Sequence, residues 1–364
     1  MFSFLISFVF SSVLNLLVVS RVKPNNSSLD SDLDGVQKMH THSVPRIGGV
    51  GIFLAALLSG LITLWRQPEI GKLFLLLLLC SLLAFLGGFV EDLTKRISPR
   101  RRLFLTMLAA VAAFFLLDAR IERLDWIASV WSFKYIWFSL PFTVFAIAGI
   151  ANAINIIDGL NGLASVVTIC MLFSIGYVAF EVNDMFVLVS ALMVAGAIGG
   201  FLIWNYPAGL IFLGDGGAYF IGFMLGQLAI LLVMRNPQVS TWYAALLLIY
   251  PAFETLFSIY RRFFLRGSSP GIPDGIHLHT LIFRRLMRWA VGPLTAEELI
   301  RRNSLTSPYL WLFSLMGVIP ATLLWRHTWA LMFFCLLFIF CYVWLYFRIV
   351  RFNVPDWLKF KRWK

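Results

Sequence analysis

Long apolar runs are the feature of this sequence that most limits its fold. Eleven segments of roughly bilayer-spanning length contain no Lys or Arg. They are 2–19, 47–65, 73–90, 103–117, 136–155, 162–180, 185–204, 217–234, 242–260, 308–325 and 329–347. A bilayer core needs about 20 mostly apolar residues per helix. With 60% hydrophobic and 13% charged residues, the chain is too apolar for a water-soluble core or for disorder. We therefore predict an all-α polytopic membrane helix bundle of about 11 transmembrane helices.

The basic residues between the apolar runs predict the orientation of this bundle. Alternating the loops between two sides places 23 of the 30 Lys and Arg on one side. By the positive-inside rule that side is cytoplasmic, so the N-terminus is expected outside and the C-terminus inside. The net charge of +12 then indicates a basic cytoplasmic face next to anionic lipid, and no nucleic-acid partner is expected. We predict one integral-membrane domain over 1–347 and a basic cytoplasmic tail over 348–364.

Cysteine usage indicates neither disulfides nor zinc. Cys80, Cys170, Cys335 and Cys341 all lie in apolar runs, and no two of them form a CxxC pair. They are expected to be buried, small apolar side chains.

An acidic pair ends the third apolar run. Glu91 and Asp92 are adjacent, and Lys95 and Arg96 follow one helical turn later. Adjacent carboxylates repel each other, which raises the pKa of one of them unless a cation lies nearby. Such a pair is typical of a functional site. The alternative is a solvated helix end.

A second polar group ends the fifth run. Asn152, Asn155 and Asp158 are spaced i, i+3, i+6, so they share one helix face. Gly159 and Gly162 then permit a tight turn. Oxygen ligands or substrate contacts are predicted here, against the alternative of polar contacts between helices.

Asp215 stands between glycines directly before a long apolar helix. A backbone of this kind can approach a phosphate closely, and a helix N-terminus favours anions. A carboxylate in this place suits Mg²⁺, which prefers one or two carboxylates together with substrate oxygens. The alternative is that Asp215 only caps the helix.

Two further stretches combine cations with turn residues. His277 and His279 alternate near Arg284 and Arg285, a set that suits a diphosphate better than zinc, since no HExxH motif is present. Solvated loop histidines are the alternative.

Arg46 precedes Gly48 and Gly49 at the start of the second run, with Lys38 and His40 upstream. A glycine-rich helix start with cations predicts another anion site. The alternative for Arg46 is a membrane anchor.

All these motifs fall on the predicted inner face. Carboxylates for a hard metal, cations for phosphates and surrounding lipid together predict an enzyme that joins a phosphorylated, water-soluble donor to a lipid acceptor. A transporter or lipid flippase is the competing class, and it would place charges near the bilayer midplane. Glu254 is the only acidic residue within a run, and we expect it to pair with Arg261, two turns further on.

Five stretches together resemble the polyprenyl-phosphate N-acetylhexosamine-1-phosphate transferases of glycosyltransferase family 4, which are related to the phospho-N-acetylmuramoyl-pentapeptide transferases. They are Lys38–His40 with Pro45–Gly49, Gly87–Asp92, Asn152–Gly159, Phe212–Asp215 and His277–His279. The motifs occur in the family order, and the resemblance covers about residues 1–347.

The resemblance implies transfer of a sugar-1-phosphate from a UDP-sugar to undecaprenyl phosphate, with release of UMP. This is the initiating step of a cell-surface glycan in the bacterial inner membrane. It also implies Mg²⁺, with Mn²⁺ as a substitute, and a homodimer. A flippase for lipid-linked sugars and a catalytically altered family member remain alternatives. The sugar and the glycan pathway stay open.

Roles for individual residues follow from the same resemblance. The catalytic residues would be Asp92, Glu91 and Asp158, and the metal ligands would be Asp215 and Asp158. The residues expected to bind substrate are Lys38, His40, Arg46, Asn152, Asn155, His277 and His279.

Three positions depart from the family pattern. Glu91 replaces the first Asp of an Asp-Asp pair, Asn161 stands where a second Asp is common, and Thr280 replaces a third His. The last departure points away from the muramoyl-pentapeptide branch.

Overall fold

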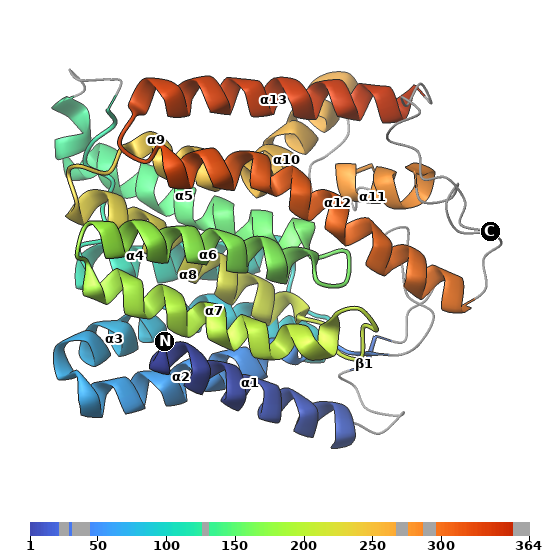
Figure 1. The fold of residues 1–364 in the computed structure, drawn as a ribbon, viewed down its shortest axis with the longest axis horizontal. Coiled ribbons are helices and arrows are strands. Elements are labelled where there is room, and N and C mark those ends of the chain that lie inside the picture. The colour runs from blue at the N-terminus through green and yellow to red at the C-terminus, as the bar shows by residue number, and fades with distance from the viewer. Residues whose placement is uncertain (22–28, 31–43, 126–130, 267–275, 287–295, 352–364) are drawn as a thin grey trace.

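The structure is a computed structural model that describes residues 1–21, 29–30, 44–125, 131–266, 276–286 and 296–351. Its long helices run side by side along one axis (Figure 1). The principal helices are α1 (Phe2–Arg21), α2 (Gly48–Arg66), α3 (Pro68–Thr94), α4 (Pro99–Leu116), α5 (Ile136–Ile157), α6 (Leu163–Glu181), α7 (Met185–Asn205), α8 (Gly214–Arg235), α9 (Thr241–Leu247), α10 (Ile249–Tyr260), α12 (Ala296–Leu323) and α13 (Thr328–Val350).

Short elements complete the described chain. They are β1 (Leu29–Asp30), β2 (Val44–Pro45), the 3₁₀ turn Trp131–Lys134, the π-helical turns Arg261–Arg266 and Ile282–Leu286, and α11 (Leu278–Leu281). The two strands pair antiparallel over two residues each, Leu29 with Pro45 and Asp30 with Val44.

The predicted all-α membrane bundle is confirmed. Among the described residues, nine helices are long and apolar enough to span a bilayer, and the bent pair α9–α10 makes a tenth candidate. The eleventh expected span is α4, which forms as a helix but carries Arg100, Arg101 and Arg102 in its first turns. Each predicted apolar run is therefore helical, and the protein is a multi-pass membrane protein.

The expected ninth span is broken. α9 and α10 meet at an angle of 70° at Leu248. Pro251 lies in the first turn of α10, where its missing N–H breaks no helical hydrogen bond. The hydropathy of the run 242–260 predicted its apolar character but not this bend.

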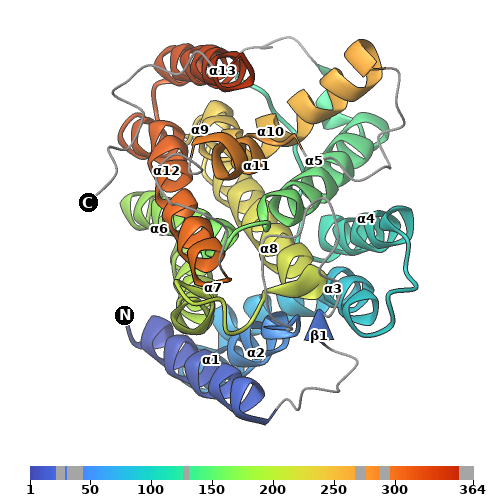
Figure 2. The same cartoon turned by 90° about the vertical axis from the view of Figure 1, so that its right-hand side faces the viewer.

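α8 lies at the centre of the bundle (Figure 2). In an apolar stretch of 18 residues within α8, 94% of the residues are buried. The same measure is 17% in α1, at one edge of the bundle, and 28% in α13, at the other. Small residues permit this close packing. A Cβ built on Gly222 of α8 would lie 2.7 Å from Ala151 Cα of α5, and one built on Gly88 of α3 would lie 2.4 Å from Gly216 N of α8.

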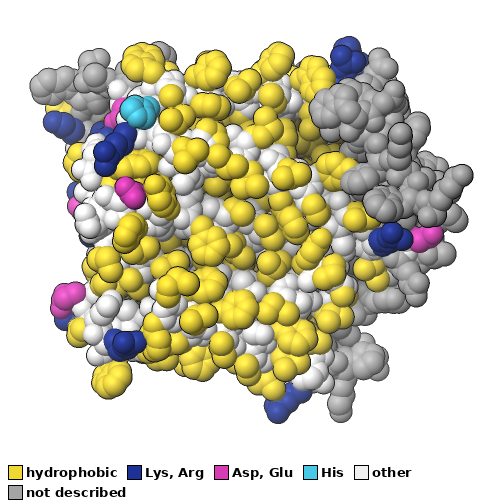
Figure 3. All heavy atoms as spheres, viewed as in Figure 1, with side chains coloured by type: hydrophobic (Ala, Val, Ile, Leu, Met, Phe, Trp, Pro, Cys, Tyr) yellow, Lys and Arg dark blue, Asp and Glu magenta, His cyan; other side chains and the backbone are white. Residues whose placement is uncertain are grey.

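The outer surface of the bundle is apolar. On the face drawn in Figure 3, hydrophobic side chains cover the middle, and charged side chains gather toward its two ends. Such a band is what lipid contact requires of the outward helix faces. All four cysteines are free thiols, but only Cys80 and Cys335 are buried as expected, whereas Cys170 and Cys341 are partly exposed.

We call the end of the bundle where α2, α6, α8 and α12 begin, and where α3, α5, α7 and α10 end, the polar end. It lies at the right in Figure 1 and faces the reader in Figure 2. The described motif residues come from these helix ends or from the segments beside them. Residues 352–364, most of the predicted tail, lie outside the described residues, and α13 runs three residues past the expected domain boundary at 347.

Candidate functional site

Backbone hydrogen bonds at the polar end join two segments, Pro45–Gly49 and Phe212–Leu213. Phe212 N donates to Pro45 O at 2.9 Å, Gly48 N donates to Phe212 O at 3.0 Å, and Gly49 N donates to Leu213 O at 2.9 Å. A Cβ on Gly49 would lie 2.3 Å from Gly217 Cα, so this approach requires glycine. The pairing places Arg46 beside the start of α8. The first amides of α2 therefore bond to these carbonyls.

Asp92 of α3 binds the first turn of α8. Its Oδ1 accepts a hydrogen bond from Asp215 N and its Oδ2 one from Gly216 N, both at 2.9 Å. The side chain is almost fully buried, at 5% exposure. A carboxylate is stabilised at this place because the helix N-terminus presents unpaired N–H groups and positive dipole. The expected anion at the α8 start is thus supplied, in this structure, by the protein itself.

Glu91 points elsewhere than Asp92. Its Oε2 accepts a hydrogen bond from Ile97 N at 2.6 Å, which closes the turn after α3. Adjacent helix residues differ by about 100° in direction, so only one of the pair can face α8. The role expected for Glu91 in catalysis stays a prediction, while its described contact is local.

Asp215 makes no capping hydrogen bond to α8, and its side chain forms ion pairs with two arginines instead. Arg102 of α4 forms an ion pair with Asp215 Oδ2, and Arg46 Nη2 lies 3.8 Å from Oδ1. Side chains of Arg102 and Asp215 are largely buried, at 11% and 16% exposure. The sequence reasoning missed Arg102. Its only signal was membership of the basic run 100–102 at a helix start, where three arginines are indistinguishable without the fold.

Asn152 connects to this ion pair through an aromatic ring. Tyr219 of α8 donates its hydroxyl hydrogen bond to Asn152 Oδ1 at 3.1 Å, and the Arg102 guanidinium lies 5.7 Å from the Tyr219 ring centroid. Asn155 is half-buried one turn further along α5. Asn152 is therefore linked through Tyr219 and Arg102 to the Asp215 carboxylate.

Asp158 follows the last residue of α5 and completes a cluster of three carboxylates. It lies close enough to Arg46 and Asp92 for both charges to act on it. Burial raises the pKa of the Asp158 carboxyl well above its usual range, and the Arg46 charge opposes that rise. Asp92, Asp158 and Asp215 thus converge around Arg46. We call these four residues and Arg102 the carboxylate–arginine cluster.

The turn after Asp158 is fastened to α7 and α12. Asn303 Oδ1 accepts from Asn161 N at 2.8 Å, and Ser307 Oγ donates to Asn161 O at 2.6 Å. Asn205 Oδ1 accepts from Gly162 N at 2.6 Å, and Gly162 has a positive φ of 71°. These bonds fix the backbone that carries Asp158.

The Asn161 departure has a structural explanation. Its side-chain Nδ2 donates to Pro207 O at 3.2 Å, and the residue is 7% exposed. An ionised aspartate has no hydrogen to donate there. Asn161 therefore anchors the turn.

His277 and His279 lie side by side at the start of the short helix α11. His277 precedes α11 in an extended conformation, and the two rings are nearly parallel with centroids 5.3 Å apart. A Cβ built on Gly159 would lie 3.0 Å from His279 Nε2. The histidine pair therefore packs against the Asp158 turn. Thr280 is buried in the same short helix.

The expected pairing of Glu254 with Arg261 is wrong. Glu254 Oε1 accepts from Leu278 N at 2.8 Å and lies 3.3 Å from His277 Nδ1. Arg261 Nη1 donates to Ile276 O at 2.6 Å and also contacts the Tyr346 hydroxyl. Both side chains reach the histidine segment, which the spacing along one helix could not reveal.

Two predicted substrate-binding residues, Lys38 and His40, lie outside the described residues. All other predicted site residues occur at the polar end. The cluster brings together Arg46, Asp92, Asp158 and Asp215, and the structure adds Arg102 and Tyr219 to them.

The donor set of the cluster fits a hard divalent cation. Within the described residues, no three His, Cys, Asp or Glu side chains form a ready-made metal site. Mg²⁺ does not need one, because it is usually held by one or two carboxylates together with substrate phosphates and water. Asp215 and Asp158 supply such carboxylates, and Asp215 already bonds to a positive charge from Arg102.

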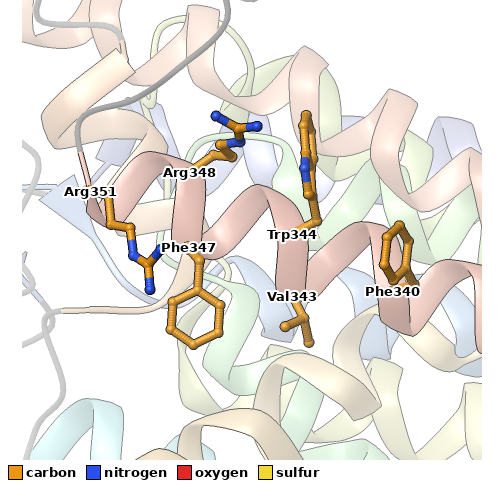
Figure 4. A pocket seen from close by; sticks show the side chains of 6 residues that line it. All are labelled: Phe340, Val343, Trp344, Phe347, Arg348 and Arg351. Carbon is orange, nitrogen blue, oxygen red and sulfur yellow. The ribbon is translucent and has the colours of Figure 1, made fainter.

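A shallow hollow on α13 is separate from this chemistry. It has a volume of about 480 Å³ and is lined by Phe340, Val343, Trp344, Phe347, Arg348 and Arg351 (Figure 4). All these residues belong to one outer helix or follow it directly. The lining includes none of the predicted site residues.

Comparisons with known proteins agree with the motifs. The model of the family described as "Glycosyl transferase family 4" matches residues 74–233, which include Asp92, Asp158 and Asp215. A Bacillus subtilis protein named "Probable undecaprenyl-phosphate N-acetylglucosaminyl 1-phosphate transferase" is 26% identical over 308 residues, which are 80% of this chain and 79% of that protein.

Two further relatives have related names. The undecaprenyl-phosphate alpha-N-acetylglucosaminyl 1-phosphate transferase of Thermotoga maritima is 29% identical, over 79% of this chain and 82% of its own length. A phospho-N-acetylmuramoyl-pentapeptide-transferase of Streptococcus pneumoniae is 29% identical over 52% of this chain and 59% of its own length. The family model therefore matches residues 74–233, in agreement with the family resemblance that the motifs indicate.

Proposed function

We propose that this protein transfers a sugar-1-phosphate, from an N-acetylhexosamine series, from a UDP-sugar to undecaprenyl phosphate and releases UMP. The broader part of this proposal is a glycosyl-1-phosphate transferase that acts on a polyprenyl phosphate. It agrees with the family match and with the names of the Bacillus subtilis and Thermotoga maritima relatives. The observation that carries the proposal is the convergence of Asp92, Asp158 and Asp215 around two arginines at one end of a membrane bundle.

The reaction is a phosphoryl transfer between two anions. An oxygen of the lipid phosphate attacks the sugar-bearing phosphorus of the donor, and the bond from that phosphorus to the UMP oxygen breaks. No proton need move when the lipid phosphate is a dianion. Most of the catalysis in such reactions comes from positioning and from neutralising charge.

The residues of the cluster have distinct places in this proposal. Arg46 and Arg102 would bind phosphate oxygens, since guanidinium groups suit that geometry. Within the described residues, Arg102 Nε is buried without a hydrogen-bond partner, which a phosphate oxygen could provide. Asp215 and Asp158 would hold Mg²⁺, which would neutralise charge on the donor diphosphate.

The remaining residues would orient the reactants. Asp92 holds the α8 start in register with α3, next to the cluster, where the lipid phosphate would lie. Asn152 and Asn155 would contact the nucleotide, and His277 and His279 would contact the donor diphosphate. We propose that this end faces the cytoplasm of a bacterial inner membrane, with the N-terminus outside, because the basic loops belong to it. A homodimer is part of the same proposal.

The direct test uses purified protein in nanodiscs with undecaprenyl phosphate, Mg²⁺ and a panel of UDP-sugars, and it measures UMP. We expect UMP with at least one UDP-N-acetylhexosamine, and loss of that product in Asp215→Asn protein that still inserts and runs as a single species. If the panel yields no UMP while the Thermotoga maritima relative does so in the same membranes, the proposal is wrong.

A further inference from the structure

Glu254 is an acidic residue at a position where burying a charge is costly. It lies in α10, within a membrane-spanning run, and is 1% exposed. Acidic residues inside spans are rare and generally pair with a specific partner or serve function. Its partners are twenty or more residues away in sequence, in the segment Ile276–His279.

Two side chains, Glu254 and Arg261, hydrogen-bond to the backbone of this segment. One accepts from a backbone N–H and the other donates to a backbone carbonyl. Glu254 Oε1 accepts from Leu278 N at 2.8 Å, and Arg261 Nη1 donates to Ile276 O at 2.6 Å. Both side chains are almost fully buried. The segment therefore has a fixed backbone on either side of His277.

The contact continues from Glu254 to the carboxylate–arginine cluster. Glu254 Oε1 lies 3.3 Å from His277 Nδ1, and the His277 ring is stacked on His279. His279 Nε2 packs against Gly159, the residue that follows Asp158. A carboxylate at this distance favours a proton on that nitrogen through its charge, and so favours one direction of the ring.

From this chain of contacts we propose that Glu254 is a positioning residue that orients His277, and His279 through it, for binding the donor diphosphate. This inference rests on the proposed function. Glu254 itself touches neither Asp158 nor Asp215 in any described contact, so its effect is expected on donor affinity rather than on the bond-making step.

Glu254→Gln removes the negative charge of the side chain but keeps an acceptor for the hydrogen bond from Leu278 N. The same Oε1 accepts from Leu278 N and lies beside His277 Nδ1, so an amide oxygen can keep both contacts, but it carries no negative charge. We expect the KM for the UDP-sugar to rise about tenfold, by analogy with the lower range for the outer partners of metal-ligating histidines, with kcat and the KM for undecaprenyl phosphate within about twofold. Glu254→Asp keeps the charge and should recover part of the donor affinity.

Glu69→Gln is the matched control, because Glu69 is an exposed acid of α3 that pairs only with Lys72 among its described contacts. Hydrogen exchange of residues 276–281 should be unchanged in Glu254→Gln and faster in Glu254→Ala, which removes the acceptor of Leu278 N. This readout needs no substrate.

The outcomes separate the two proposals. An unchanged donor KM in Glu254→Gln, or a fall in kcat alone, overturns the positioning role while wild-type turnover supports the proposed function. A wild-type protein without turnover overturns the proposed function. Unchanged exchange in Glu254→Ala overturns the contact from Glu254 to the histidine segment in either case.

Discussion

Gly88 of α3 gives the sharpest test of how the cluster is built. A Cβ built there would lie 2.4 Å from both Gly216 N and Asp215 C of α8. Favourable contacts between heavy atoms lie near 3.5 Å, so Gly88→Ala must push the two helices apart by about 1 Å. The hydrogen bonds from Asp215 N and Gly216 N to Asp92, at 2.9 Å, would stretch to about 3.9 Å, beyond bonding range.

The expected effect is large in both stability and rate. Each hydrogen bond to a charged group contributes about 1.5–3 kcal/mol, and overpacking adds a penalty of about 1–3 kcal/mol. The gain of about 0.5–1 kcal/mol for replacing a helical glycine is smaller than either. A displacement of about 1 Å at a reacting centre lowers turnover roughly 100-fold.

The assay compares Gly88→Ala with Gly149→Ala. Gly149 lies in α5, and a Cβ there would meet nothing within 4 Å. We expect UMP release to fall about 100-fold in Gly88→Ala, with a lower melting temperature, and to stay within about twofold in Gly149→Ala. Equal turnover in the two variants would refute the packing argument. If Gly88→Ala does not insert, Asp92→Asn tests the same two bonds without a clash, since an amide offers only one acceptor oxygen.

Three further predictions concern the cluster and its turn. Arg102→Gln should raise the KM for the UDP-sugar about tenfold by removing one guanidinium from the diphosphate, whereas Arg101→Gln, at an exposed neighbouring position, should not, and equal effects would contradict a specific role. Chelation with EDTA should abolish UMP release and added Mg²⁺ or Mn²⁺ should restore it, so turnover that survives chelation would contradict the metal role of Asp215 and Asp158. Asn161→Asp should lower stability by about 1–3 kcal/mol, because an acceptor would replace the donor that faces Pro207 O, and an unchanged melting temperature would contradict that anchor.

The helices and the meeting of the motifs could be predicted from sequence. Apolar runs of bilayer length leave little choice of fold, since the backbone must satisfy its hydrogen bonds within each segment. Alternation of such runs then puts Arg46, Asp92, Asp158 and Asp215 at one end. That end is indeed where the structure places them.

The partners of each side chain could not be predicted in the same way. Which of Arg100, Arg101 and Arg102 faces Asp215 depends on the rotation of α4, and that rotation is set by packing against neighbouring helices. Glu254 was expected to bond along its own helix, but a segment brought back by the loops lies closer. The 70° bend between α9 and α10 leaves the hydropathy of the run unchanged, so no sequence average detects it.

The enclosed position of α8 has a consequence for how such a chain can vary. With 94% of its apolar window buried and glycines at its closest approaches to α3 and α5, a larger side chain almost anywhere on α8 would displace several helices together. α1 and α13 touch the bundle on one side only and can exchange one apolar residue for another. Sequence drift among proteins with this architecture should therefore collect on the periphery and spare the axis that carries Asp215.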